Sequence, residues 1–429
     1  MVAKVIIWDM FAGAILWNSE RGYASFEYTK DFLERGLDLS PVMMPVSEAL
    51  TTGKIFYFPA LNKETFKGLP GMLSDSLPDR YGNRIIDRWL AKQGRTPESF
   101  NPVERLCYIG KRGMGALEFE PVLSRADNKS EKVEVEELVK LANEILNDRK
   151  GLRVNINKKV DEGLRQIIKV GTSAGGARAK AIIAYNKDTG EVRSGQIDNL
   201  PGFEYWLIKF DGVQDNELGS PRGYGRIEYA YNRMAKDCGI EIAESMLMTE
   251  NNRAHFLSKR FDRAGTEKVH MQTLCGIAHM DYNEPASYSY EQAFQVMRRM
   301  RLPYSAAEQL FRRMVFNVLA LNRDDHTKNI SFLMDKSGAW RLAPAYDITF
   351  SFNPQSKWIS RHQLSVNGKR EAISDEDILS VAKSMNIKKP GTVLDRVKDV
   401  LDRWKEYAGM SRVDEEQADY ISKLLRQKP

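Results

Sequence analysis

The chain has 429 residues and a formal net charge of +6, with 42% hydrophobic and 28% charged residues. These values are ordinary for a globular protein with a large core, and the length predicts two or three domains. The small positive charge permits contact with nucleic acid or with acidic proteins but does not require it.

The cysteines Cys107, Cys238 and Cys275 lie far apart in the sequence. This spacing argues against a zinc site and against a disulfide framework. No stretch reaches the roughly 20 apolar residues of a membrane helix, and residues 2–17 lack the order of cationic and apolar residues found in signal peptides. We therefore expect a cytoplasmic protein without membrane contact.

The apolar pattern and the turn residues predict a mixed first half and a helical second half. In chain order, the predicted elements are strands within 1–30, a helix over 73–91, a linker over 124–135, a helix over 135–146, strands over 167–170, 181–185 and 204–210, a helix over 228–238, helices from about 290, a hairpin over 329–343 and a helical tail over 375–426.

Residues 110–119 and 171–180 are both rich in glycine. The first stretch has no following helix to present N–H groups, so a hairpin or a close backbone approach is favoured over a phosphate site. The second lies between two predicted strands, and a plain hairpin turn would explain it if it stood alone. Because Lys209 follows on the next strand, the order matches the way a kinase N-terminal lobe binds ATP.

The most informative residues are Asp324 with Asn329 five positions later, followed by Asp347 beyond a predicted hairpin. In protein kinases an aspartate and an asparagine at this spacing orient the substrate hydroxyl and help hold Mg²⁺, and a second aspartate completes the metal site. The sequence therefore predicts phosphoryl transfer from ATP to a protein hydroxyl.

Several neighbouring residues allow two interpretations. Asp325 is either a second carboxylate of the site or a capping residue, and the cap is favoured. His326 is interpreted as a structural hydrogen-bond partner rather than as the base. Lys209 could simply extend its ammonium group to solvent, and Glu228 is either its partner or a surface glutamate. Residues 256–263 fall where a hinge between two kinase lobes would lie.

Seven motifs in this order resemble the HipA family of bacterial serine/threonine kinases, the toxins of HipA–HipB toxin–antitoxin pairs. They are Leu77-Pro78-Asp79 with Gly82, Gly113 to Glu118, Ser173 to Lys180, Leu207 to Lys209, Arg260 to Arg263, Asp324 to Asn329 and Leu342 to Ile348. The resemblance covers nearly the whole chain.

The resemblance implies an α+β, bilobal, protein-kinase-like fold with a mixed α/β N-terminal lobe and a mainly helical C-terminal lobe. Residues 1–125 would form a HipA-type N-terminal subdomain, and residues 126–258 the rest of the N-terminal lobe with the phosphate-binding loop. Residues 259–429 would form the C-terminal lobe, which contains the catalytic loop and the metal site.

The resemblance also implies that ATP and Mg²⁺ are the cofactors. The nucleotide-binding residues would be Ala174, Gly175, Gly176, Ala177, Arg178 and Lys180 in the phosphate-binding loop, Lys209 at the α- and β-phosphates, and Lys259, Arg260 and Phe261 beside the adenine. Asp324 would be the catalytic base, and Asn329 and Asp347 would bind Mg²⁺. The loop departs from the family at Arg178 and Ala179, where better-known members have Gln and Glu, so its contacts to phosphate stay open.

Ser173 falls where the family has its inhibitory autophosphorylated serine, although Thr172 is adjacent. The implied function is an ATP-dependent serine/threonine kinase that arrests growth. An aminoacyl-tRNA synthetase, glutamyl-tRNA synthetase first, would be its substrate, and a HipB-like helix-turn-helix antitoxin would neutralise the kinase and make most of the contacts with operator DNA. The alternative is a kinase-fold binding module or corepressor with little phosphotransfer.

The basic groups at 298–301, 312–313 and 388–389 could contact tRNA, operator DNA or an acidic partner. As short and separate clusters they are better interpreted as solvated helix faces.

Overall fold

The computed structural model describes residues 1–78, 80–123, 132–147, 178–195, 200–213, 223–265 and 267–427. The strands are β1 (Val2–Ile7), β2 (Met10–Asn18), β3 (Tyr23–Tyr28), β4 (Leu117–Glu120), β5 (Lys180–Tyr185), β6 (Val192–Ser194), β7 (Glu204–Lys209), β8 (Ser245–Glu250), β9 (Arg253–Lys259), β10 (Arg263–Ala264), β11 (Glu267–Lys268), β12 (His270–Thr273), β13 (Ser331–Met334) and β14 (Trp340–Leu342).

The helices are α1 (Lys30–Leu33), α2 (Val46–Thr52), α3 (Lys63–Phe66), α4 (Gly71–Ser74), α5 (Arg80–Lys92), α6 (Pro102–Ile109), α7 (Val135–Asn147), α9 (Tyr224–Asp237), α10 (Leu274–Ala278), α11 (Tyr290–Arg299), α12 (Tyr304–Leu319), α13 (Asp375–Ser384), α14 (Pro390–Asp402), α15 (Trp404–Met410) and α16 (Glu415–Arg426). Two short 3₁₀ helices are η1 (Pro97–Ser99) and η2 (Thr327–Asn329).

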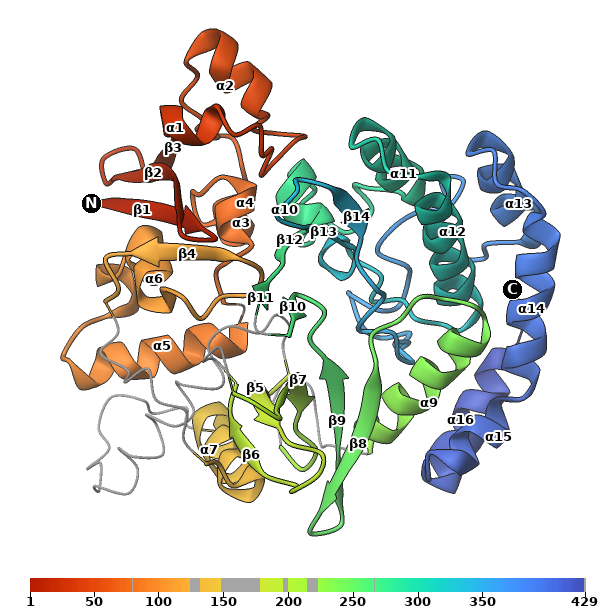
Figure 1. The fold of residues 1–429 in the computed structure, drawn as a ribbon. Coiled ribbons are helices and arrows are strands. Elements are labelled where there is room, and N and C mark those ends of the chain that lie inside the picture. The colour runs from red at the N-terminus through yellow and green to blue at the C-terminus, as the bar shows by residue number, and fades with distance from the viewer. Residues whose placement is uncertain are drawn as a thin grey trace.

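The first part of the chain forms an antiparallel sheet in the order β3-β2-β1-β4, drawn in red and orange in Figure 1. Buried and exposed residues alternate along β1, so Ala3, Val5 and Ile7 lie on the buried face, as expected for a strand with one face on the core. The short helices around this face complete the first hydrophobic core. Met334 of β13 belongs to the same core, so this subdomain packs on the hairpin that precedes Asp347.

A second antiparallel sheet has the order β6-β5-β7-β9-β8. Helices α5 and α7 pack on it, and their apolar residues share one core with Trp206 of β7 and Leu257 of β9. β7 lies between β5 and β9. At its end Lys209 is therefore opposite Lys180 on one side and Phe256 on the other.

The last part of the chain is mainly helical and is drawn in teal and blue in Figure 1. Its core joins α9 to the later helices, with Tyr231 of α9 packed edge-on against Phe316 of α12 and Trp404 of α15. The sheet β12-β13-β14 lies beside these helices. α12 leads directly into the loop that contains Asp324.

Most of the predicted elements that fall within the described residues are confirmed, and two differ. The helix expected over 73–91 is two helices, α4 and α5, separated at Pro78, because proline lacks the N–H that a continuing helix needs. α9 begins at Tyr224 rather than at Glu228, directly after Gly223 in the left-handed conformation. The strand expected over 167–170 and most of the linker lie outside the described residues.

None of the helices within the described ranges combines the length and the apolar character that crossing a membrane requires.

Candidate active site

The ammonium group of Lys209 lies between two carboxylates, one from α9 and one from the segment after β14. Its Nζ donates to Glu228 Oε1 at 2.5 Å and to Asp347 Oδ1 at 2.6 Å. The side chain of Glu228 is 9% exposed and that of Asp347 is 34% exposed. The pairing of Lys209 with Glu228, which the sequence left open, is therefore present and shielded from water.

These contacts determine the charge of the three groups. Burial alone would lower the pKa of Lys209, but the carboxylates of Asp347 and Glu228 outweigh it and raise the pKa. Burial raises the pKa of Glu228, since Lys209 offsets only part of the desolvation. Burial alone would raise the pKa of Asp347, but Lys209 and Lys180 together outweigh it and lower the pKa. Lys209 stays charged, and Asp347 is the more readily ionised of its two partners.

The backbone around Asp347 is held in an uncommon conformation. Asp347 has a φ of 53°, in the left-handed region that residues other than glycine rarely adopt. Just before it, the Tyr346 hydroxyl donates to the carbonyl of Lys328 at 2.5 Å. The buried Arg313 donates to the carbonyl of Ala343 at 2.7 Å. These bonds fix Asp347 relative to the loop that contains Asp324.

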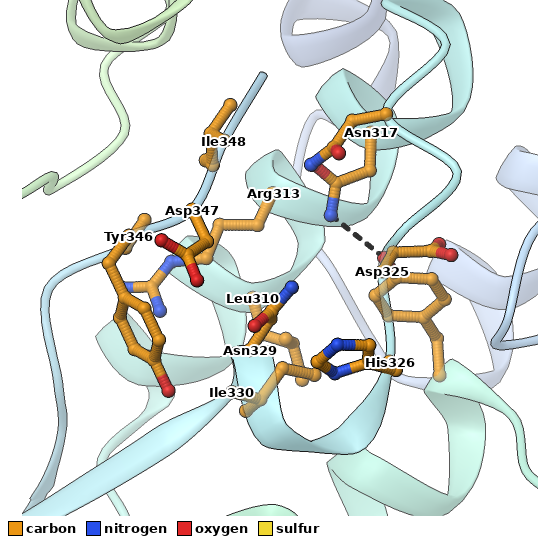
Figure 2. A pocket seen from close by; sticks show the side chains of 13 residues that line it. Leu310, Arg313, Asn317, Asp325, His326, Asn329, Ile330, Tyr346, Asp347 and Ile348 are labelled. Atoms are coloured by element: carbon orange, nitrogen blue, oxygen red, sulfur yellow. Dashed lines mark hydrogen bonds between the residues drawn. The ribbon is translucent and has the colours of Figure 1, made fainter. Parts of the chain in front are cut away.

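Asp324 projects from a closed loop. The side-chain amide of Asn329 donates to the carbonyl of Asp324 at 2.7 Å and holds the two residues together. The carboxylate of Asp324 is 50% exposed, and Nε2 of His326 lies 3.7 Å from it, which is too long for a hydrogen bond. The carboxylate of Asp324 is therefore accessible to solvent. His326 and Asn329 of this loop line one pocket together with Asp347 (Figure 2).

Asp325 has a different environment from Asp324. It is 3% exposed and accepts bonds from the Tyr290 hydroxyl, from His362 and from the backbone N–H of Gln363. The capping interpretation of Asp325 is therefore wrong, because its partners come from distant segments and not from the start of a helix. No local sequence signal pointed to these partners.

Asn329 and Asp347 fit Mg²⁺ by the chemistry of their donor atoms. Because the amide nitrogen of Asn329 is used by the Asp324 carbonyl, its oxygen is left as a ligand. Mg²⁺ prefers oxygen ligands and commonly uses one or two carboxylates together with phosphate oxygens. Within the described residues, no group of three or more His, Cys, Asp or Glu side chains is placed to hold a metal.

The residues predicted to border the adenine lie in different environments. Phe261 packs against Tyr346 with ring centroids 5.5 Å apart, next to Asp347. The ammonium group of Lys259 pairs with Glu204 and Glu244 on the sheet surface. The guanidinium of Arg260 is buried and pairs with Asp262. The positions of these residues beside adenine stay a prediction.

The phosphate-binding loop is described only at its end, since Ser173, Ala174, Gly175, Gly176 and Ala177 lie outside the described residues. The guanidinium of Arg178 lies 3.8 Å from the ring centre of Tyr224. Lys180 is 2% exposed and faces Lys209 across β5 and β7.

Both of these cations act on the carboxylates that contact Lys209. After burial and Lys209, the charge of Lys180 is among the effects that lower the pKa of Asp347. The charge of Arg178 has a smaller effect on Glu228, whose pKa it lowers against the larger effect of burial. Arg178 thus influences Glu228, and Lys180 influences Asp347, the two carboxylates that contact Lys209.

Asp262 was not predicted to have a role, yet it joins the glycine turn before β4 to the residues that follow β9. Its buried carboxylate pairs with Arg260 and Arg263 and accepts the N–H of Gly115 at 2.7 Å. Gly115 has a φ of 74°, and a Cβ there would come within 3.0 Å of the Met271 nitrogen. The close backbone approach predicted for the glycine turn is confirmed. The only signal for Asp262 was its place in a family motif.

Comparison with known families agrees with this arrangement. Residues 3–120 match the HipA N-terminal domain, and residues 172–407 match the HipA-like C-terminal domain. The chain belongs to the HipA family. A structural likeness extends over 99% of the chain to a Shewanella oneidensis MR-1 protein solved as a complex of HipA, HipB and operator DNA, with a TM-score of 0.68, 17% identity and 95% of that chain covered. The expected α+β, kinase-like fold is confirmed.

Two curated relatives match parts of this HipA-family chain. A Haemophilus influenzae protein named "Putative kinase" is 28% identical over 135 residues, which are 28% of this chain and 39% of that protein. A Sinorhizobium fredii protein named "Putative kinase Y4mE" is 25% identical over 152 residues, 33% of each chain. The matches therefore span well under half the length of either relative.

Proposed function

We propose that the chain is an ATP-dependent serine/threonine protein kinase. The main support is the position of Lys209, which contacts both Glu228 of α9 and Asp347 after β14. In protein kinases a lysine paired with a helix glutamate binds the ATP phosphates, and an aspartate nearby binds the metal.

The surrounding residues have complementary tasks in this proposal. Asp324 would orient the acceptor hydroxyl and accept its proton, since its carboxylate is half exposed. Lys209, with Lys180 close by, would balance the negative charge of the phosphates. Mg²⁺, when bound by Asn329 and Asp347, would supply further positive charge to the phosphate oxygens.

The biological role that we propose is that of a growth-arresting toxin. Its substrate would be an aminoacyl-tRNA synthetase, with glutamyl-tRNA synthetase tested first. A HipB-like helix-turn-helix antitoxin would neutralise it and would carry the contact with operator DNA. Support comes from membership of the HipA family and from the fold shared with a protein solved together with HipB and operator DNA.

We further propose that autophosphorylation at Ser173 limits the activity. A phosphate there would add about two negative charges close to the predicted phosphate site. Repulsion between these charges and the phosphates of ATP would disfavour nucleotide binding.

Mass spectrometry tests these proposals on the purified chain, incubated with Mg-ATP with and without glutamyl-tRNA synthetase. We expect phosphoserine on the peptide that contains Ser173 and on the synthetase, and neither modification with Asp324→Asn. A chain that binds an antitoxin and its operator but transfers no phosphate to any protein would instead support the corepressor alternative.

A further inference from the structure

The carboxylate of Asp325, next to the proposed base, receives three hydrogen bonds in the protein interior. The Tyr290 hydroxyl and His362 Nδ1 lie 2.9 and 3.0 Å from Oδ2, and the N–H of Gln363 lies 2.8 Å from Oδ1. Burial alone would raise the pKa of Asp325, but His362 and these bonds outweigh it and lower the pKa. The carboxylate is therefore ionised and can only accept, so Nδ1 of His362 carries the proton in this contact.

The residue before the base is connected to the same part of the chain. The backbone N–H of Arg323 donates to the carbonyl of Ser351 at 3.0 Å. Its guanidinium lies 4.2 Å from the ring centre of Phe352 and donates to the carbonyl of Ser360. Both neighbours of the base in the sequence are therefore bound to residues 351–363, the segment that follows Asp347.

Asp324 itself is left outside this network. Its side chain is 50% exposed, whereas Asp325 is 3% exposed and His362 is 2% exposed. The position of the base is thus determined by its two neighbours and by the bond from Asn329 to its backbone carbonyl, and not by bonds to its own carboxylate. In protein kinases, the loop near the catalytic site is commonly ordered by an added phosphate bound to arginine. Here an ionised carboxylate and a histidine join the loop to the following segment.

We propose, on the basis of the kinase function above, that Asp325 and His362 are positioning residues for the base Asp324. Their hydrogen bond joins the catalytic loop to residues 351–363 and holds the base in line for transfer without a phosphate on that segment. The nucleotide contacts of Lys209 come from other elements, so loss of this bond should affect the transfer step and not ATP binding.

Steady-state kinetics of the full-length chain, with the acceptor protein identified by mass spectrometry, test this proposal. For His362→Ala we expect kcat to fall about tenfold or more, while KM for ATP stays within about twofold of wild type. His362→Asn should regain part of kcat, because the amide nitrogen of Asn can take the place of Nδ1. Arg361→Ala is the matched control, since Arg361 pairs with Glu371 on the surface and should keep the wild-type kcat.

Tyr290→Phe removes another donor to Asp325 and keeps the aromatic ring in the core, so it tests the same network if His362→Ala does not fold. Its kcat should fall less than that of His362→Ala, again with KM for ATP unchanged. The proposal would be overturned if the folded variants kept the wild-type kcat, or if KM for ATP rose as much as kcat fell. It would also be overturned if kcat of His362→Asn were no higher than that of His362→Ala. If the wild-type chain itself transfers no phosphate, the kinase function fails and this inference fails with it.

Discussion

Nζ of Lys209 lies 2.6 Å from Oδ1 of Asp347, although 138 residues separate them in the sequence. This ion pair connects the five-stranded sheet with the segment that follows the β13–β14 hairpin. Because Glu228 approaches the same ammonium group from α9, three distant segments meet at one cation. The β7 strand, helix α9 and the segment after β14 are therefore held together at this site.

The pair between Lys209 and Glu228 should be needed for transfer. A hydrogen bond to a charged group contributes about 1.5–3 kcal/mol, and each 1.36 kcal/mol corresponds to about tenfold in rate. We therefore expect Glu228→Gln to lower kcat/KM for ATP by about ten- to a hundredfold. Glu136→Gln is the control, because Glu136 is also a helix glutamate paired with a lysine, but at the surface. Equal activity of the two variants would contradict the assigned role of Glu228.

The buried carboxylate of Asp262 should be important for stability. Burial alone would raise its pKa, but Arg260 and Arg263 outweigh it and bring the pKa far below its ordinary value. Asp262→Asn would leave two buried guanidinium groups without their anion, and losing one partner of a buried pair costs about 3–5 kcal/mol. We expect a loss of this size in the free energy of unfolding measured with urea.

A surface ion pair close by in the sequence provides the comparison for Asp262. Glu267 and Lys336 pair at 2.9 Å, but both side chains are more than half exposed, and such pairs contribute about 0–1 kcal/mol. Glu267→Gln should therefore change the urea midpoint little. If Asp262→Asn is as mild as Glu267→Gln, the contact between the turn at Gly115 and residues 260–263 does not depend on this carboxylate.

Stability should fall in mildly acidic solution because of His270. Burial lowers the pKa of His270 from 6.5 to about 4, so between these values the unfolded chain binds a proton that the folded chain does not. The free energy of unfolding should therefore decrease as pH falls from 6.5 to 4, by roughly 3 kcal/mol from this residue, and should be independent of His270 above that range. Burial also lowers the pKa of His279, so this residue should contribute to the same loss of stability at low pH.

Urea unfolding at pH 7 and pH 4.5 measures this dependence. His270→Gln cannot take up a proton in this range, so its loss of stability between the two pH values should be smaller than that of the wild type. The same loss in both proteins would show that another group is responsible.

The sequence was informative where the chemistry depends on spacing within one stretch. Asp324 and Asn329 lie in one loop, and the β13–β14 hairpin returns the chain to Asp347. Their proximity could therefore be predicted from a short motif and a local turn. The close approach of the backbone at Gly115 was also predictable, because glycines without Cβ atoms let two backbones meet and no helix follows this turn to present N–H groups to a phosphate.

Contacts between distant residues could not be predicted in the same way. Asp325 contacts residues 290, 362 and 363, and no periodicity or short motif connects these positions. For Glu228 the sequence allowed two interpretations, since whether a helix glutamate faces a lysine or solvent depends on how α9 packs. The start of α9 was placed too late because Gly223, which precedes it in the left-handed conformation, is not a side-chain cap.

The most direct test of the central proposal is transfer of radiolabelled γ-phosphate from ATP to protein in a bacterial lysate and to purified glutamyl-tRNA synthetase. The wild-type chain should label a protein on serine or threonine. Asp324→Asn should reduce the labelling to background while still binding ATP, and the exposed control Asp188→Asn should retain it. Equal labelling by wild type and Asp324→Asn would contradict the proposed kinase mechanism, as would ATP binding by the wild type without labelling of any protein.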